Sequence, residues 1–308
     1  MTLPVIAEVV RSGYVEGTHT GSVLVVDATG ATVRALGDVD RPVFPRSSNK
    51  PLQAVGLLAA GWRPTSAEDV ALATASHSGE PDHLDVVRRM LSSAGLSSYD
   101  LRCPPMLPLS EAAAHALLAS GERPTPLTMN CSGKHAAMLA CAVARDEPVS
   151  SYPDPTHPVQ QAVQRTIEEL AHERVEHVAV DGCGAPQHAL SLRGLARAFT
   201  ALVRDHREVA DAMRAHPWHV GGTGRDVTTL MERVPGLVAK DGAEGVYAVA
   251  LADGSAVVLK IEDGAGRART PVLVAALRHL GVEGLDELAT TPVLGGGLQV
   301  GEVRAVGV

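Results

Sequence analysis

Strand patterns at both ends of the chain, with helical patterns between them, constrain the fold more than any other feature of the sequence. Two valine-rich runs in residues 22–37 flank an Asp-Ala-Thr-Gly sequence, which favours a tight hairpin. Residues 246–263 repeat this pattern around an Asp-Gly pair, and residues 298–308 follow three glycines as a closing strand. Hairpins imply antiparallel pairing, so we expect the two ends to build one antiparallel sheet.

The middle of the chain carries apolar residues at the i, i+3, i+4 spacing of amphipathic helices. Helices are expected at 51–61, 84–95, 111–121, 134–146, 159–173, 193–204, 208–215, 225–233 and 271–280, and Ser66 resembles a cap before another at 70–76. We therefore predict an α+β fold in a single domain, residues 1–308. The sheet region with its flanking helices covers about 1–60 and 235–308, and an inserted helical region covers about 61–234. The cleft between them is the natural place for a site.

The composition excludes several classes of partner. Asp and Glu number 35 against 27 Lys and Arg, a net charge of −8, so we expect no nucleic-acid footprint and no polybasic membrane surface. No apolar run is long enough to span a membrane, and the N-terminus lacks the basic start of a signal peptide, so we expect a cytoplasmic protein. Four cysteines in 308 residues indicate no disulfide scaffold.

Ser47 and Lys50 are the first candidates for chemistry. Their S-x-x-K spacing places both side chains on one face of a helix, one turn apart. A lysine whose pKa is lowered by burial or by another cation can take the proton of a serine hydroxyl and activate it as a nucleophile. The alternative is a surface serine that caps a helix ahead of a solvated lysine.

Three further segments carry polar groups in unusual surroundings. The segment 76–80 (SHSGE) interrupts a helical pattern with two serines, either of which can supply a nucleophile or cap the next helix. Lys260 stands in an apolar strand pattern, where a lysine is either exposed or buried for a purpose. The segment 221–225 (GGTGR) is either an anion cradle or a simple helix-start loop.

Cys131 and Cys183 lie in separate segments that contain glycine, NCSGKH and DGCGAP. Two thiols from separate loops are soft ligands that suit zinc. The C-x-x-C spacing and a His–His pair are absent, so a disulfide and two unrelated buried thiols stay open as alternatives. Cys141 lies on a core helix pattern, and Cys103 has no assigned role.

Taken together, the segments PRSSNK, ASHSGEPDH, MNCSGKHAAM, DGCGAP, GGTGRD and LKIEDG resemble, in this order, the asparaginase II family, the third structural class of L-asparaginase. The resemblance extends from about residue 5 to residue 305. It implies a fold similar to that of serine β-lactamases and serine glutaminases, and hydrolysis of L-asparagine to L-aspartate and ammonia. It also implies a homodimer.

The same resemblance implies two catalytic Ser–Lys pairs, Ser47 with Lys50 and Ser78 with Lys260, while Ser76 is an alternative to Ser78. One serine attacks the amide to form an acyl-enzyme, which water then hydrolyses. Two lysines that lie close together repel, so we expect at least one to be neutral at the working pH and the activity optimum to be alkaline.

The resemblance further implies one zinc ion per chain, bound by Cys131, Lys134 and Cys183. The ion is expected to position the substrate and to take no part in the chemical step. Three other residues match neighbouring motif positions and are expected to bind substrate: Arg46, Glu80 and Asp181.

Rival functions stay open from the sequence. S-x-x-K also favours a β-lactamase or penicillin-binding-type acyltransferase, although the S-D-N and K-T-G motifs are absent. Glutaminase activity is a further alternative. A non-catalytic zinc-binding protein would use the two cysteines but would not need the Ser–Lys pairs.

Overall fold

The computed structural model describes residues 2–308. Eight strands form one antiparallel sheet in the order β6-β7-β8-β2-β1-β10-β9, with β3 paired to β2, while β4 and β5 form a separate ribbon. The strands are β1 (Val5–Arg11), β2 (Tyr14–Val26), β3 (Thr32–Leu36), β4 (Val178–Val180), β5 (Pro186–His188), β6 (Val238–Gly242), β7 (Val246–Ala250), β8 (Ala256–Ile261), β9 (Thr290–Gly295) and β10 (Leu298–Ala305).

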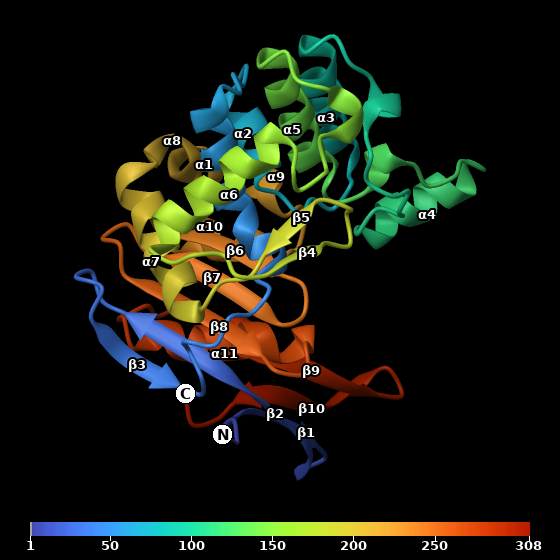
Figure 1. The fold of residues 1–308 in the computed structure, drawn as a ribbon. Coiled ribbons are helices and arrows are strands. Elements are labelled where there is room, and N and C mark those ends of the chain that lie inside the picture. Colours follow the sequence, from blue (N-terminus) through green and yellow to red (C-terminus); the bar gives the residue numbers. More distant parts are fainter. Residues whose placement is uncertain (1) are drawn as a thin grey trace.

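Helices fill the chain between β3 and β6, and α11 follows β8 (Figure 1). The α-helices are α1 (Lys50–Ala60), α2 (Ala67–Ala73), α3 (Pro81–Ser93), α4 (Glu111–Ala119), α5 (Ser132–Ala144), α6 (Pro158–Ala171), α7 (Leu192–Asp205), α8 (Arg207–Ala215), α9 (Pro217–Val220), α10 (Asp226–Arg233) and α11 (Gly266–Arg278). The short 3-10 helices are η1 (Arg46–Asn49), η2 (Ser98–Asp100), η3 (Pro126–Thr128), η4 (Val149–Ser151) and η5 (Asp286–Leu288). Figure 1 shows α4 extending away from the other helices, and none of its residues is buried.

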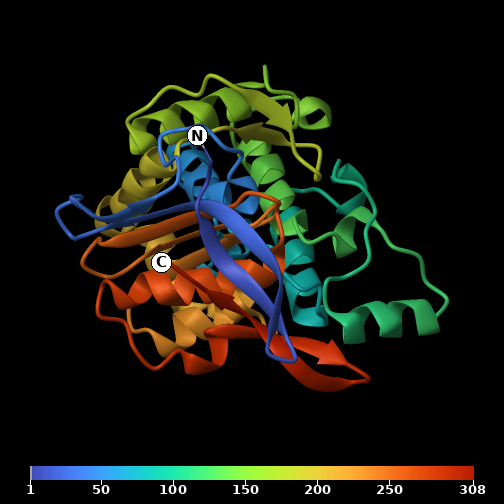
Figure 2. The same ribbon diagram turned by 90° about the horizontal axis from the view of Figure 1, so that it is seen from below.

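The two ends of the chain share the sheet. Strand β1 pairs with β10, and β2 pairs with β8 from Gly21 opposite Ile261 to Val26 opposite Ala256. Seen from below, the N-terminal strands in blue and the C-terminal strands in red lie side by side (Figure 2). The two ends of the chain therefore form one antiparallel sheet, and the helical middle is inserted between them in the sequence.

Strand β6 matters most for the site because it is an edge of the sheet and lies between η1 and α11. A Cβ at Gly242 would lie 2.4 Å from the carbonyl oxygen of Pro45, so this face of β6 meets the segment that leads into η1. On the opposite face Arg269 of α11 approaches the carboxylate of Asp241 at 3.8 Å. Because side chains alternate along a strand, Lys240 leaves β6 on the face of Gly242, and its amine reaches the carbonyl oxygen and the carboxylate of Asp241.

The structure confirms the α+β class and the antiparallel sheet from both chain ends. The expected hairpins are β2–β3 and β7–β8, the closing strand is β10, and every expected helix is present. Ser66 caps α2, since its Oγ accepts a hydrogen bond from the N–H of Asp69. The strands missed in the sequence are β1 with the first half of β2, β5, β6 and β9. The apolar run of β6 is broken by Lys240, Asp241 and Gly242. No helix in residues 2–308 combines the length and the apolar character needed to cross a membrane.

Candidate active site

Ser47 and Lys50 lie where η1 passes into α1. Lys50 is 1% exposed, and its Nζ donates hydrogen bonds to Ser76 Oγ (3.1 Å) and to the carbonyl oxygen of Ala75. Ser47 is partly exposed, and its hydroxyl has no hydrogen-bond partner among residues 2–308. Arg46, directly before it, has a φ of +55°, which is a strained backbone for a residue with a side chain. The structure therefore brings Lys50 to Ser76 and leaves the Ser47 hydroxyl unengaged.

The segment between α2 and α3, residues 74–80, is here called the serine loop. Ser78 is 2% exposed, and its Oγ donates a hydrogen bond to the carbonyl oxygen of Gly221 (2.9 Å). The chain passes so close that a Cβ on Gly222 would lie 2.2 Å from Ser78 Oγ. Glu80 accepts hydrogen bonds from the N–H (2.9 Å) and the hydroxyl (2.8 Å) of Thr223. Glu80 thus holds residues 221–225, here called the glycine segment, against Ser78.

Lys260 lies on β8, two strands from β6 in the sheet order. Its Nζ donates hydrogen bonds to the carbonyl oxygens of Glu244 (2.7 Å) and Ile261 (2.6 Å). Burial lowers its pKa. No hydrogen bond in residues 2–308 joins Lys260 to Ser78, whose Oγ donates to Gly221. Lys260 is therefore held by backbone carbonyls in this structure, and the pairing with Ser78 is not formed.

Lys240 was missed in the sequence, yet it lies at the centre of the site. It is 0% exposed, and its Nζ donates hydrogen bonds to the carbonyl oxygen (2.8 Å) and the carboxylate of Asp241. Burial lowers the pKa of Lys240 to about 8; Asp241 opposes this shift, and the charges of Lys50 and Arg225 add to it. An amine with this pKa exchanges its proton near neutral pH, as a general base must.

Asp241 is the anion that Lys240, Arg225 and Arg269 surround. Burial alone would raise its pKa, but Lys240, Arg225 and Arg269 hold that pKa well below its usual range. Arg225 donates hydrogen bonds to Asp241 Oδ2 (2.8 Å) and to the carbonyl oxygen of Ser76 (3.3 Å). Arg225 therefore ties β6 to the serine loop, and Asp241 stays charged while the lysine titrates.

Two signals in the sequence point to Lys240 in retrospect. The chain has only four lysines, Lys50, Lys134, Lys240 and Lys260, and the first three are at most 1% exposed. Lysine is normally among the most exposed residues, so this scarcity and burial mark each one. Lys240 to Gly242 also has the spacing of the K-T-G motif, with aspartate in place of threonine.

Cys131, Lys134 and Cys183 converge and are here called the thiol–lysine cluster. Lys134 Nζ donates a hydrogen bond to Cys183 Sγ (3.1 Å). The hydrogen bond from Cys131 holds the pKa of Cys183 well below its usual range, and the charge of Lys134 adds to this effect. The same hydrogen bond and burial raise the pKa of Cys131. All four cysteines are free, so the disulfide alternative is not formed.

The thiol–lysine cluster offers two sulfur donors and one nitrogen donor, which suits zinc. Burial lowers the pKa of Lys134, but the negative charges of Cys183, Cys131 and Asp181 outweigh burial and raise it. Across the described residues, 2–308, no group of three or more His, Cys, Asp and Glu side chains is placed to hold a metal ion. The residues therefore fit a zinc ion only with Lys134 as the third donor.

A salt bridge connects this cluster to η1. Arg46 Nε donates a hydrogen bond to Asp181 Oδ1 (2.7 Å), and Asp181 precedes Cys183 by two residues. The charge of Lys50 also tends to lower the pKa of Cys131, although the hydrogen bond to Cys183 dominates there. The predicted residues thus form two adjoining groups, one around Lys50 and one around Cys183. Lys260 lies outside both.

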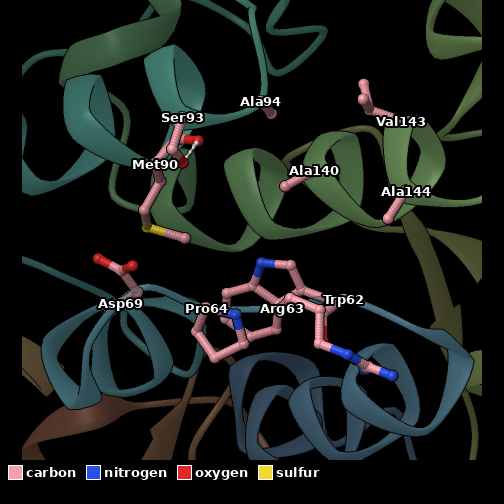
Figure 3. A pocket seen from close by; sticks show the side chains of 10 residues that line it. All are labelled: Trp62, Arg63, Pro64, Asp69, Met90, Ser93, Ala94, Ala140, Val143 and Ala144. Atoms are coloured by element: carbon pink, nitrogen blue, oxygen red, sulfur yellow. Dashed lines mark hydrogen bonds between the residues drawn. The ribbon is translucent and has the colours of Figure 1, made fainter.

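Figure 3 shows a pocket of about 160 Å³ lined by α2, α3, α5 and the segment after α1. Trp62, Met90 and Ala140 form part of its lining. Its one carboxylate, Asp69, is already paired with Arg89 (2.9 Å). None of the candidate catalytic or metal-binding residues lines this pocket, so we place the chemistry at the Lys50 and Lys240 groups instead.

Comparison with known proteins gives one family. The family model described as L-asparaginase II matches residues 7–305. No curated protein matches the chain significantly. Solved structures include a protein named Mglu, with 13% identity, a TM-score of 0.45, and 86% of this chain and 69% of that chain covered. They also include a β-lactamase from Mycobacterium bovis (13% identity, TM-score 0.38, 85% and 95% covered) and a mutant of the simvastatin synthase LovD from Aspergillus terreus (12%, 0.39, 84% and 88%). Likeness at this level does not establish a shared activity.

The lowered pKa of Lys240 predicts a pH dependence of stability. The unfolded chain holds the Lys240 proton up to a pKa near 10.5, whereas the folded chain loses it near pH 8. Between these values the unfolded state binds more protons, so stability rises with pH in this window. Denaturant unfolding at several pH values from 7 to 10.5 should show this rise in the wild type, and Lys240→Met should remove it.

The four lysines make a direct control possible. In a ¹³C NMR titration of the lysine side chains, one signal should titrate near pH 8 and should be absent from Lys240→Met. A spectrum in which every lysine titrates above pH 10 would contradict the assignment of Lys240 as the low-pKa group.

Proposed function

The chain belongs to the L-asparaginase II family, and we propose that it hydrolyses the side-chain amide of L-asparagine to L-aspartate and ammonia through an acyl-enzyme. The family supports amide hydrolysis of the L-asparaginase type. The observation that carries the mechanism is the packing of η1, which bears Ser47, on the edge strand β6, which bears Lys240, next to the hydrogen bond from Lys50 to Ser76. A binding protein has no need of two buried lysines at this junction.

We assign the nucleophile to Ser47. Its hydroxyl is partly exposed and unengaged within residues 2–308, while Ser76 is bonded to Lys50 and Ser78 to Gly221. The neutral amine of Lys240 takes the Ser47 proton as Ser47 Oγ attacks the amide carbon of the substrate, giving a tetrahedral intermediate. The lysine ammonium then gives its proton to the leaving nitrogen, the C–N bond breaks, and ammonia departs.

Water completes the cycle by attacking the Ser47 ester. The lysine amine accepts a proton from this water and returns it to Ser47 Oγ as aspartate leaves. Lys240, with its pKa near 8, supports this exchange, and Lys50 supports it by placing positive charge beside Lys240. This supports an alkaline optimum, since activity should rise as Lys240 loses its proton.

The second Ser–Lys pair of the family is proposed here as Ser78 with Lys240. Ser78 lies on the serine loop, which Arg225 ties to Asp241 beside Lys240. Lys260 carries the pairing in the sequence resemblance, but its amine is committed to backbone carbonyls. The experiment below includes both lysines, so that the two assignments are compared directly.

Zinc is proposed as the cofactor, held by Cys131, Lys134 and Cys183. When bound, the ion supplies positive charge that orients the substrate, and Lys134 must be neutral to bind it. Arg46 and Asp181 are proposed to bind the polar ends of the amino acid, because their salt bridge lies between Ser47 and the thiol–lysine cluster. Glu80 supports substrate binding by fixing the glycine segment.

One observation favours a second candidate. The Lys-Asp-Gly sequence on β6 resembles the K-T-G motif of β-lactamases and penicillin-binding proteins. Purified protein incubated with L-asparagine, L-glutamine and a chromogenic β-lactam separates the readings. Ammonia release from asparagine supports the proposal, whereas β-lactam hydrolysis without ammonia release overturns it.

Ser47→Ala and Lys50→Ala should each lower kcat for asparagine by several orders of magnitude. The double variant should lose little more, because members of one catalytic unit are not additive. Lys240→Met should also lose most activity, and Lys260→Met should retain more of it. Ammonia release measured for the five variants tests these expectations. Near-normal turnover of Ser47→Ala would move the nucleophile to Ser78 or Ser76.

Removal of zinc should raise KM for asparagine more than it lowers kcat, because the ion is assigned to positioning. Elemental analysis should find one zinc per chain, lost in Cys131→Ser and in Cys183→Ser. Cys141→Ser is the matched control, since Cys141 is a buried cysteine whose thiol donates to the carbonyl oxygen of Leu57. Metal-free wild type whose KM does not respond to added zinc would overturn this role.

We also propose that two copies form a homodimer, as the family resemblance implies. Light scattering at micromolar concentration should give twice the mass of the 308-residue chain. A strictly monomeric protein at that concentration would exclude the dimer.

A further inference from the structure

His77, between Ser76 and Ser78, has no role in the mechanism above, yet it is 0% exposed and bonded on both sides of its ring. Its Nδ1 accepts a hydrogen bond from the N–H of Gly79 (3.1 Å). Its Nε2 lies 2.9 Å from Ser132 Oγ. Because Nδ1 accepts, the ring of a neutral histidine carries its proton on Nε2, which donates to Ser132.

The bond to Gly79 shapes the turn that contains Ser78. A side chain that accepts from the N–H two residues ahead mimics an Asx turn, which asparagine forms readily. Gly79 has a φ of +73°, and a Cβ there would lie 2.9 Å from Pro108 Cβ. This turn therefore fixes the direction of Ser78, whose Oγ reaches Gly221.

The other side of the ring joins the serine loop to the segment that carries the metal-binding candidates. Ser132 follows Cys131 and opens α5, the helix that also carries Lys134. The main-chain N–H of His77 donates a second hydrogen bond to the carbonyl oxygen of Asn130 (3.2 Å). His77 thus holds this segment by its backbone and by its side chain.

A stack of rings braces His77 from behind. Its ring stacks on His83 with centroids 5.3 Å apart, and His83 stacks on Trp218 at 3.9 Å. Trp218 Nε1 donates a hydrogen bond to Thr223 Oγ1 (3.0 Å), the residue that Glu80 holds. The stack therefore returns to the glycine segment that contacts Ser78.

Charge supports the neutral form of this ring. Burial lowers the pKa of His77 well below its usual range, and His83, Lys50 and Arg225 add to the effect. A neutral ring has one donor and one acceptor, and both are used here. His77 therefore acts as a fixed connector with no proton to exchange at working pH.

We propose that His77 is a positioning residue that fixes the distance between the Ser78 turn and the segment carrying Cys131 and Lys134, so that the substrate meets both at one spacing. This inference rests on the proposed asparagine hydrolysis. This role differs from that of an ordinary core histidine, because one ring nitrogen bonds to the Ser78 turn and the other bonds to the segment that carries Cys131 and Lys134.

Two variants cut the connection from opposite ends. His77→Asn keeps an acceptor for the Gly79 N–H but is too short to reach Ser132, and Ser132→Ala removes the other partner. Each should lower kcat/KM for asparagine between about tenfold and a hundredfold, because small misplacements of bound groups are costly. The double variant should be no worse than either single variant, since both remove the same interaction. His77→Phe should lose further kcat, because the Ser78 turn also loses its acceptor.

His157→Asn is the matched control. His157 is 5% exposed, its Nδ1 accepts from the N–H of Val159 (3.2 Å), and its Nε2 lies 3.1 Å from the carbonyl oxygen of Pro148. The substitution therefore removes an equivalent bond away from the serine loop. It should lower the unfolding temperature while leaving kcat/KM within about twofold of wild type.

A readout without substrate separates failure of this inference from failure of the proposed function. In ¹⁵N NMR the His77 ring of the wild type should show a neutral form protonated on Nε2, and Ser132→Ala should shift this signal. Wild type that releases no ammonia from asparagine overturns the proposed function alone if the NMR result holds. An Nδ1-protonated ring, additive losses in the double variant, or full activity of Ser132→Ala would overturn the connector.

Discussion

The burial of two lysine amines where η1 packs on β6 is the constraint on which the rest of this site depends. Lys50 enters from the first turn of α1 and Lys240 from the edge strand β6, and neither is more than 1% exposed. Burial already disfavours the charged form of Lys240, and the charge of Lys50 disfavours it further. Asp241 limits the shift of the Lys240 pKa and does not cancel it, because burial is the larger effect. The packing of η1 on β6 thus produces a lysine that is a base near neutral pH.

That packing is held from several directions, which explains why segments far apart in the chain all contribute short polar contacts. Ser48 Oγ donates to the carbonyl oxygen of Lys240 (3.0 Å), which fixes η1 on the strand. Arg225 holds the serine loop to β6, and Arg46 holds η1 to the thiol–lysine cluster. Space is short around these contacts, since a Cβ on Gly222 would lie 2.2 Å from Ser78 Oγ.

Much of this fold could be predicted from the sequence, because hairpins with Asp-Gly turns and helices with regular apolar spacing carry local signals. Strand β6 carries no such signal, since its five residues include Lys240, Asp241 and Gly242, and only the tertiary setting buries them. The family resemblance instead pairs Ser78 with Lys260, which stands in the longer apolar run VVLKIED, although its amine ends on backbone carbonyls. The link from Lys50 to Ser76 was also beyond the sequence, since S-x-x-K spacing favours Ser47 and the serine loop approaches through tertiary packing.

Arginine and lysine have different roles in this site. Of the 27 Lys and Arg residues in the chain, only four are lysines, and three of these, Lys50, Lys134 and Lys240, are buried in the site. Arginine keeps its proton in proteins, so it suits permanent ion pairs such as Arg225 with Asp241 and Arg46 with Asp181. Lysine loses its proton when burial and a neighbouring cation act together, and amide hydrolysis needs a group that takes a proton and returns it. A lysine replaced by arginine at position 240 would keep the charge and lose that exchange. We infer that position 240 is lysine because its proton has to leave.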